Sequence, residues 1–251
     1  MVSLVPSWTE TLHALGAAER LVGVTEYCVH PDAARTQAAV VGGTKTPDLQ
    51  RILALAPDVV IANREENRRL DVERLEAAGA CVFVTDARTV AQAALEIEQL
   101  GALVGAAPRA RELAHAIRAA LLRGVPSPPV CTVALIWKDP YMALGGDCFA
   151  HDLLERCGAS NPFAARERRY PRIALDELVA AAPELILLPT EPYAFGEPDR
   201  RELLALDCPA ARSAQIHVVE GELLTWYGPR IPRALATFRE LVLRARAASA
   251  E

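Results

Sequence analysis

The feature that most constrains this chain is a passage that occurs twice. Residues 48–62 read DLQRILALAPDVVIA and residues 174–188 read ALDELVAAAPELILL, so that Pro183 follows Pro57 by 126 residues. Each copy predicts a short helix, a break at the proline and a buried strand. A long-period internal repeat indicates one structural unit built twice. We therefore expect two similar lobes with a ligand site between them.

Two further pairs of segments support a duplication. Residues 10–17 (ETLHALGA) resemble residues 152–159 (DLLERCGA), and each predicts a helix that ends at a glycine with left-handed backbone. Residues 82–86 and 216–220 each predict a strand that ends in an acid. The alternative explanation is the general similarity of alanine-rich α/β segments, and three matched pairs make it weaker.

The hydrophobic pattern predicts an α/β fold with mainly parallel sheets, because apolar strand runs alternate with amphipathic helices. The strands are expected at residues 2–5, 20–24, 58–62, 81–85, 130–136, 184–188 and 215–219. The helices are expected at residues 8–15, 48–54, 66–78, 89–104, 149–157, 174–181, 199–206 and 229–247. This order is typical of two Rossmann-like lobes.

A single long helix is predicted to join the two lobes. We expect an N-terminal lobe at residues 1–106, a linking helix at residues 107–125 and a C-terminal lobe at residues 126–251. A helical link predicts lobes that rock through small angles, whereas a flexible Gly/Ser link would allow wide opening.

The composition excludes several classes of protein. The chain is 51% hydrophobic and 24% charged, which is ordinary for a globular protein, and it has no apolar run of the roughly 18 residues that span a membrane. Its net charge of -5 and lack of a Lys/Arg block argue against a nucleic-acid partner. The six cysteines form no C-x-x-C motif, so we expect no zinc or redox site. We expect a monomer without an intrinsic cofactor.

The N-terminus leaves the compartment open. The first predicted strand begins directly after Met1, so no secretory signal is expected in front of it. A removed export signal and a cytoplasmic protein both fit this beginning.

Candidate ligand residues follow the predicted strands, because ligands of doubly wound sheets bind beyond the carboxyl ends of the strands. Aromatic residues make up only 5% of the chain, yet all three tryptophans and four of the five tyrosines lie in these loops. Aromatic rings offer flat contact area at a small entropic cost. The candidates from these loops are Trp8, Tyr27, Lys45, Asn63, Glu65, Trp137, Tyr141, Tyr193, Trp226, Tyr227 and Arg230.

Some of these loops also permit other chemistry. Cys28 and His30 are spaced to act as a thiol nucleophile with its base or as metal ligands, but no third group is fixed by the sequence. Lys45 is either a ligand contact or a solvated loop residue. Glu65 opens a helix, where the helix dipole alone favours an acid.

Several motifs together resemble one family. They are SLVPSWTE at residues 3–10, VGG at 41–43, ILALAPD at 52–58, GG at 145–146, LLERCG at 153–158, NPF at 161–163 and GPR at 228–230. The combination resembles the helical-backbone substrate-binding proteins of ABC importers, which include the vitamin B12-binding and iron-siderophore-binding components. The resemblance covers roughly residues 2–245.

The resemblance implies a non-enzymatic, periplasmic binding protein that captures a metal chelate in an interlobe site and closes little around it. In the B12-binding branch aromatic side chains hold the corrin, and the matching positions lie near Thr44, Asn63, Tyr170 and Trp226. Two of these four residues are aromatic here, so Tyr170 joins the candidates. The implied ligand is cobalamin-like, or an iron chelate of the siderophore or haem type.

The resemblance also implies docking on an ABC permease. In the B12-binding branch one acid near the start of the repeated helix in each lobe pairs with permease arginines, and the matching positions are Gln50 and Asp176. Gln50 cannot form an ion pair, but Asp48 lies two residues away.

Two other hypotheses remain open at this stage. One is a cytoplasmic ligand-handling protein or enzyme that reuses the scaffold, with Cys28, His30 or Glu65 reactive. The other is direct binding of a free metal ion, for which the sequence offers no three- or four-ligand set.

Overall fold

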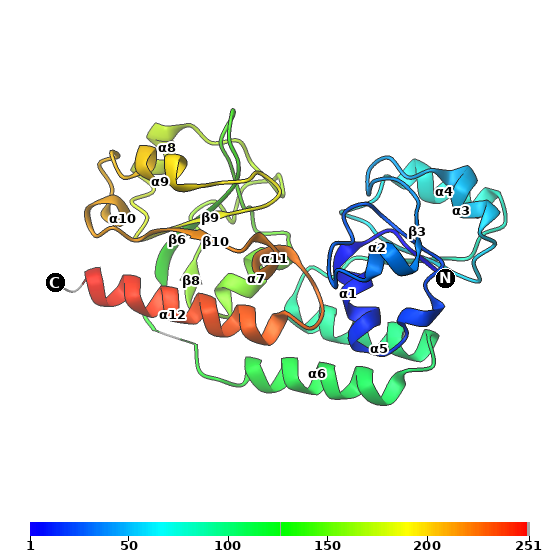
Figure 1. The fold of residues 1–251 in the computed structure, drawn as a ribbon. Coiled ribbons are helices and arrows are strands. Elements are labelled where there is room, and N and C mark those ends of the chain that lie inside the picture. The colour runs from blue at the N-terminus through cyan, green and yellow to red at the C-terminus, as the bar shows by residue number, and fades with distance from the viewer. Residues whose placement is uncertain (126, 250–251) are drawn as a thin grey trace. The chain divides into compact units, whose positions relative to one another are not determined.

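The structure, a computed structural model, describes residues 1–125 and 127–249, and the chain divides into two compact units (Figure 1). The first unit comprises residues 1–87, 92–115 and 226–229, and the second comprises residues 88–91, 116–225 and 230–251. Each half of the chain therefore contributes a four-residue segment to the other unit, which the division predicted from the sequence did not anticipate. Residues 126, 250 and 251 of the predicted C-terminal lobe lie outside the described residues.

The first unit contains a five-stranded sheet in the order β3-β2-β1-β4-β5, and all its pairings are parallel. Its strands are β1 (Val2–Ser3), β2 (Gly23–Val24), β3 (Ala39–Val40), β4 (Val60–Asn63) and β5 (Val82–Thr85). Val2 pairs with Gly23 on one side and with Val60 on the other. The strand order reverses at β1, which is where doubly wound folds place their ligands.

The helices of the first unit lie on both sides of this sheet (Figure 1). They are α1 (Pro6–Ala14), η1 (Ala18–Arg20), α2 (Ala34–Gln37), α3 (Leu49–Ala54), α4 (Arg69–Ala77), most of α5 (Val90–Leu103) and the first part of α6 (Ala107–Leu121). On the side of α3 and α4, Ile52 and Leu75 pack with Val2, Leu4 and Val60 of the sheet region. All five side chains are buried, so this apolar layer fixes both helices on the sheet.

The second unit contains a sheet in the order β10-β9-β6-β7, with β8 also paired to β6. Its strands are β6 (Val130–Trp137), β7 (Met142–Ala143), β8 (Ala159–Ser160), β9 (Leu185–Pro189) and β10 (Ile216–Val219). Only the β6–β7 pairing is antiparallel among these. The prediction of two α/β lobes with mainly parallel sheets is confirmed.

The helices of the second unit also lie on both sides of its sheet. They are α7 (Phe149–Glu155), α8 (Leu175–Ala180), α9 (Glu197–Leu203), α10 (Pro209–Arg212), α11 (Gly221–Thr225) and α12 (Ile231–Ser249). In Figure 1, α8 and α9 lie on one side and α12 on the other. The last part of α6, from Ala116, belongs to this unit, so α6 carries the chain from the first unit to the second.

The backbone confirms the internal repeat. Helices α3 and α8 start and end 126 residues apart, at Leu49–Ala54 and Leu175–Ala180. Each is followed by an alanine with positive φ, at +44° for Ala56 and +47° for Ala182, directly before the repeated proline. A proline disfavours right-handed helical backbone at the preceding residue, so both helices end in the same way.

Arg239 of α12 fixes the helices around it within the second unit. Its side chain is 9% exposed and donates hydrogen bonds to the carbonyls of Ala120, Arg123 and Arg156. These carbonyls lie at the ends of α6 and α7, where helices have unpaired acceptors. A buried guanidinium therefore satisfies the carboxyl ends of two helices at once.

Residues 1–125 and 127–249 contain no helix that combines the length and the apolar character of a membrane span. They also contain no group of three or more His, Cys, Asp and Glu side chains that could hold a metal ion.

Candidate ligand-binding residues

In the first unit, the carboxyl ends of β4 and β5 carry a buried polar network formed by Trp8, Asn63, Asn67 and Thr85, which we call the first-unit network. Trp8 is fully buried in α1, and its Nε1 donates to the Thr85 hydroxyl at 2.8 Å. Asn63 Nδ2 donates to the same oxygen at 3.0 Å, and the hydroxyl in turn donates to the Ala62 carbonyl at 3.1 Å. The Thr85 hydroxyl therefore uses its full hydrogen-bonding capacity.

Asn63 also builds the loop that follows β4. Its Oδ1 accepts from the backbone N–H groups of Glu65 and Glu66 at 2.9 and 3.2 Å. Its own backbone N–H donates to Asn67 Oδ1 at 2.8 Å. Asn63 is only 1% exposed, so its side chain is buried with its polar atoms paired. The sequence predicts a ligand contact at Asn63, and the structure shows a loop-forming role there.

Residues 226–229 pack into the first unit. The Tyr227 ring stacks on Trp8 with centroids 5.6 Å apart, and its hydroxyl donates to Glu65 Oε2 at 3.5 Å. Burial, and secondly the charge of Glu65, raises the pKa of Tyr227 well above its usual value. Gly228 has a φ of +94°, and a Cβ there would lie 2.1 Å from Thr11 Oγ1, so only glycine fits.

Trp226 lies beside His30 in the same unit, edge to face, with ring centroids 5.6 Å apart. Trp226 is 7% exposed and Tyr227 is 4% exposed. Both side chains are therefore buried in the folded chain.

In the second unit, an aromatic group lies at the carboxyl ends of β6 and β9. Trp137 is 42% exposed, and it contacts Tyr193 edge to face at 5.9 Å between centroids. Tyr193 in turn contacts the buried Phe195 at 4.6 Å. Trp137 is thus accessible to solvent, and Tyr193 lies between it and the buried Phe195 in this chain of ring contacts.

The turn after β6 is held by an ionic network. Lys138 Nζ donates to Asp199 Oδ1 at 2.8 Å and to Glu202 Oε2 at 2.6 Å, and Tyr141 donates to Glu202 Oε1 at 2.9 Å. Hydrogen bonds to Asp199 and Glu202 raise the pKa of Lys138. Burial, with the hydrogen bond to Glu202, raises the pKa of Tyr141 to about 12. All four groups keep their charge state near neutral pH and fix the turn.

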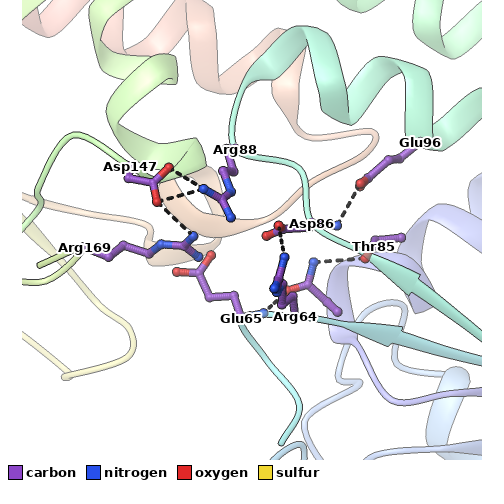
Figure 2. Close-up of polar contacts among 9 residues, drawn as sticks. Arg64, Glu65, Thr85, Asp86, Arg88, Glu96, Asp147 and Arg169 are labelled. Carbon is purple, nitrogen blue, oxygen red and sulfur yellow. Dashed lines mark hydrogen bonds and ion pairs between the residues drawn. The ribbon is translucent and has the colours of Figure 1, made fainter. Parts of the chain in front are cut away.

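A second ionic cluster of this unit is the Arg88–Asp147–Arg169 cluster (Figure 2). Arg88 Nη1 lies 2.9 Å from both oxygens of Asp147, and Arg169 Nη2 lies 3.4 Å from Oδ2. Desolvation acts to raise the pKa of Asp147, but the hydrogen bonds and charges of Arg88 and Arg169 more than offset it and leave this pKa below its usual value. The carboxylate therefore stays ionised.

The other candidates from the sequence are spread over both units. In the first unit Tyr27 is 56% exposed, and the exposed Lys45 donates to the backbone carbonyl of the half-buried Glu65. In the second unit Tyr170 is half-buried, and Arg230 pairs with Glu220.

The candidate docking residues are exposed in both units. Asp48 is the N-cap of α3 and accepts from the Arg51 N–H at 3.0 Å, and Gln50 lies in the first turn of that helix. Asp176 lies at the corresponding place in α8. The repeat thus places Gln50 and Asp176 at equivalent positions, whereas Ala174 takes the place of Asp48.

Cys28 lacks the environment of a nucleophile. Its sulfur is buried, 3.1 Å from the Thr9 hydroxyl and 3.2 Å from the Thr25 hydroxyl. Burial raises the pKa of this thiol, whereas reactive cysteines have a lowered pKa. This environment weakens the hypothesis of a thiol enzyme.

The sequence interpretation missed Arg88, Asp147 and Arg169. A signal was present, because residues 166–172 contain four arginines and one glutamate in a chain with a net charge of -5. Which of these arginines meets a carboxylate depends on the path of the loop, and a local sequence pattern does not define that path.

These units have the fold of periplasmic solute-binding proteins. The periplasmic vitamin B12-binding protein of Vibrio cholerae matches 98% of this chain and 96% of its own at a TM-score of 0.83 and 22% identity. A periplasmic heme-binding protein of Pseudomonas aeruginosa matches 96% of this chain and 91% of its own at a TM-score of 0.82 and 26% identity. Among relatives by sequence, the vitamin B12-binding protein of Yersinia pestis is 26% identical over 192 residues, or 75% of this chain and 68% of the relative.

Residues 1–193 match the model of the family described as periplasmic binding protein. The chain belongs to this family. The resemblance inferred from the sequence motifs is therefore confirmed, and the chain is a solute-binding protein.

Proposed function

We propose that this protein binds a metal chelate and delivers it to an ABC-type importer. The observation that carries the proposal is the family match together with relatives named for vitamin B12 and for heme. Both of these ligands are flat metal macrocycles. A half-exposed tryptophan supported by other aromatic rings, as at Trp137, suits stacking on such a surface.

The role we propose is binding without catalysis, in the periplasm. The relatives named above are binding proteins, and two of them are periplasmic. The ligand brings its own metal coordination, so the protein needs only shape, stacking and a few polar contacts. This agrees with the raised pKa of the Cys28 thiol, which disfavours a nucleophilic role.

A titration panel tests this proposal. The purified protein should bind cobalamin, cobinamide, haemin or a ferric siderophore with a dissociation constant in the micromolar range or below, measured by calorimetry and by the absorbance of the chelate. Trp137→Ala should weaken binding by on the order of 1 kcal/mol if the ring stacks on the ligand. Leu122→Ala, at an 87% exposed apolar residue, is the matched control and should leave the affinity unchanged. No binding across the panel at tens of micromolar would contradict the function.

Docking on a permease is proposed through Asp48, Gln50 and Asp176. All three residues are exposed at the start of α3 or α8, and Gln50 and Asp176 occupy equivalent positions there. Asp176→Arg should keep the ligand affinity and weaken binding to the cognate permease in detergent. Equal binding of the variant and the parent to the permease would remove Asp176 from the docking surface.

A further inference from the structure

We infer that the outer edge of β5 in the first unit pairs with the same edge of a second copy of this chain. The two five-stranded sheets would then join in a weak homodimer. β5 is the last strand in the order β3-β2-β1-β4-β5, and no strand among residues 1–125 and 127–249 pairs with its outer edge. The inference does not depend on the ligand, and it departs from the monomer expected from the sequence.

The backbone of β5 presents hydrogen-bonding groups at this edge. The Cys81 carbonyl accepts from the Val60 N–H at 2.8 Å, and the Thr85 carbonyl accepts from the Arg64 N–H at 2.9 Å. Successive residues of a strand direct their N–H and C=O groups to opposite edges, so Val82 and Val84 direct theirs away from β4. Val84 is 46% exposed. An open edge of this kind is a template for another strand.

The other sheet edges are shorter or are blocked. In β10, the carbonyls of Gln215 and Val219 accept from residues of β9 and its end, so the Ile216 carbonyl faces outward. Arg200 Nε occupies that carbonyl at 2.8 Å. The strands β3, β7 and β8 have two residues each. Charged side chains and short strands are the usual protection against edge pairing, and β5 differs from these strands on both counts.

The sequence of the β5 edge is complementary to itself. Residues 79–85 read GACVFVT and carry no charge. Antiparallel pairing centred on Phe83 places Val82 opposite Val84 of the second copy. In an antiparallel pair, two opposed residues whose groups face each other exchange both N–H···O=C bonds. The twofold axis repeats this exchange, so both outward-facing valines of each copy are satisfied.

The side chains fit the same register. Phe83 meets Phe83 of the second copy at the centre, and aromatic pairs across strands stabilise a sheet. The register places Asp86 opposite Ala80, so no like charges face each other directly. The uncharged edge contains nothing that would select a charged partner strand. A second copy is therefore the occupant that this edge favours.

The size of the edge limits the strength of the dimer. β5 has four residues, Val82–Thr85, and only two of them direct backbone groups outward. Interfaces that bury less than about 1,200 Å² are typical of weak, transient complexes. We therefore expect a monomer–dimer equilibrium that depends on protein concentration.

Sedimentation velocity of the full chain from low to high micromolar concentration tests the inference. The average mass of the parent should rise towards that of a dimer. Val84→Lys should weaken association at least about tenfold, because a lysine on an edge strand opposes pairing. Leu243→Lys is the control, since Leu243 lies in α12 and is 50% exposed, and it should associate like the parent. Both variants should keep the parent's unfolding midpoint, because both side chains are largely exposed.

Cysteine cross-linking tests the register. Phe83→Cys is made together with Cys81→Ser, which removes the exposed native thiol. The two introduced thiols would have Cα atoms about 4.5 Å apart, within the range that a disulfide can span. Oxidised glutathione should therefore produce a covalent dimer on a non-reducing gel. In the parent, the two Cys81 residues would lie about 13 Å apart along the strands and should not cross-link.

Three outcomes would overturn the inference. The first is a monomer at every concentration for the parent. The second is equal association of the parent and Val84→Lys, which would place any dimer contact on another surface. The third is a covalent dimer of the parent through Cys81, because the strands would then pair in a different register. If Phe83→Cys lowers the unfolding midpoint, the comparison of Val84→Lys with Leu243→Lys decides alone.

Discussion

The two units place different chemistry at corresponding ends of their sheets. In the first unit, Trp8 and Asn63 form a network that is almost completely buried, with the Thr85 hydroxyl shared between them. In the second unit, Trp137 is 42% exposed, and the charged Arg88–Asp147–Arg169 cluster is also accessible to solvent. Similar backbone thus carries a polar core in one unit and an accessible surface in the other. An aromatic residue near the end of a strand does not reveal by itself which role it has.

The largest expected difference between the units is in the two tryptophans. Trp8→Ala should lower the free energy of unfolding by about 3–5 kcal/mol, because it removes a fully buried ring and leaves a cavity. Trp137→Ala should lower it by less than about 1 kcal/mol, because that ring is already 42% exposed. Urea unfolding followed by circular dichroism measures both values. Equal losses would show that the contrast between a buried and an accessible end is wrong.

Two asparagines sharpen the comparison at a smaller scale. Asn63→Ala should cost about 1–3 kcal/mol, because it leaves the N–H groups of Glu65 and Glu66 without their acceptor. Asn161 of the second unit makes a similar turn by accepting from the Phe163 N–H at 2.9 Å, but its side chain is only half-buried. Asn161→Ala should therefore cost less, since water can reach the groups it leaves. Urea midpoints of the two variants decide this, and a larger loss at Asn161 would reverse the ranking.

The sequence predicted the long elements of the fold because their patterns are local. The repeat around Pro57 and Pro183 correctly predicted α3, β4, α8 and β9, since each proline stops a helix and starts a buried strand. Strands β1 and β2 are only two residues long, but they were predicted because they lie within the longer strand patterns at residues 2–5 and 20–24. No such pattern was recognised around β3, β7 and β8, and these two-residue strands were missed. Tertiary pairing alone defines such strands.

The candidate site was harder to predict than the fold. The pattern placed Trp8 and Trp137 in equivalent loops, but their burial depends on packing that a local sequence does not encode. For Trp8, the decisive neighbour is Tyr227, which is more than two hundred residues away along the chain. The pairing of Arg88 with Asp147 likewise depends on a four-residue segment that joins the second unit. Long-range contacts of this kind decide whether a loop residue becomes core or surface.

The smallest expected effect concerns how the free energy of unfolding depends on pH. One carboxylate in each unit should contribute to this dependence, with opposite signs. In the first unit, Glu96 Oε1 accepts from the Asp86 N–H at 2.8 Å, while Oε2 is buried without a hydrogen-bond partner among residues 1–125 and 127–249 (Figure 2). Burial raises the pKa of Glu96. The favourable contribution of Glu96 to the free energy of unfolding is therefore present below its pKa in the unfolded chain, about 4.3. This contribution is lost as the pH rises through its pKa in the folded protein.

Asp147 in the second unit should behave in the opposite way. Its pKa is lowered, so its contribution is present above the unfolded pKa of about 3.9 and is lost as the pH falls through the folded pKa. Relative to the parent protein, Glu96→Gln should gain stability as the pH rises above about 4.3, and Asp147→Asn should gain stability as the pH falls below about 3.9. Unfolding midpoints between about pH 3 and pH 7 test both signs. If the stability of both variants relative to the parent changed in the same direction with pH, the environments of Glu96 and Asp147 would shift their pKa values in the same direction. The contrast between the two units would then not apply to these two carboxylates.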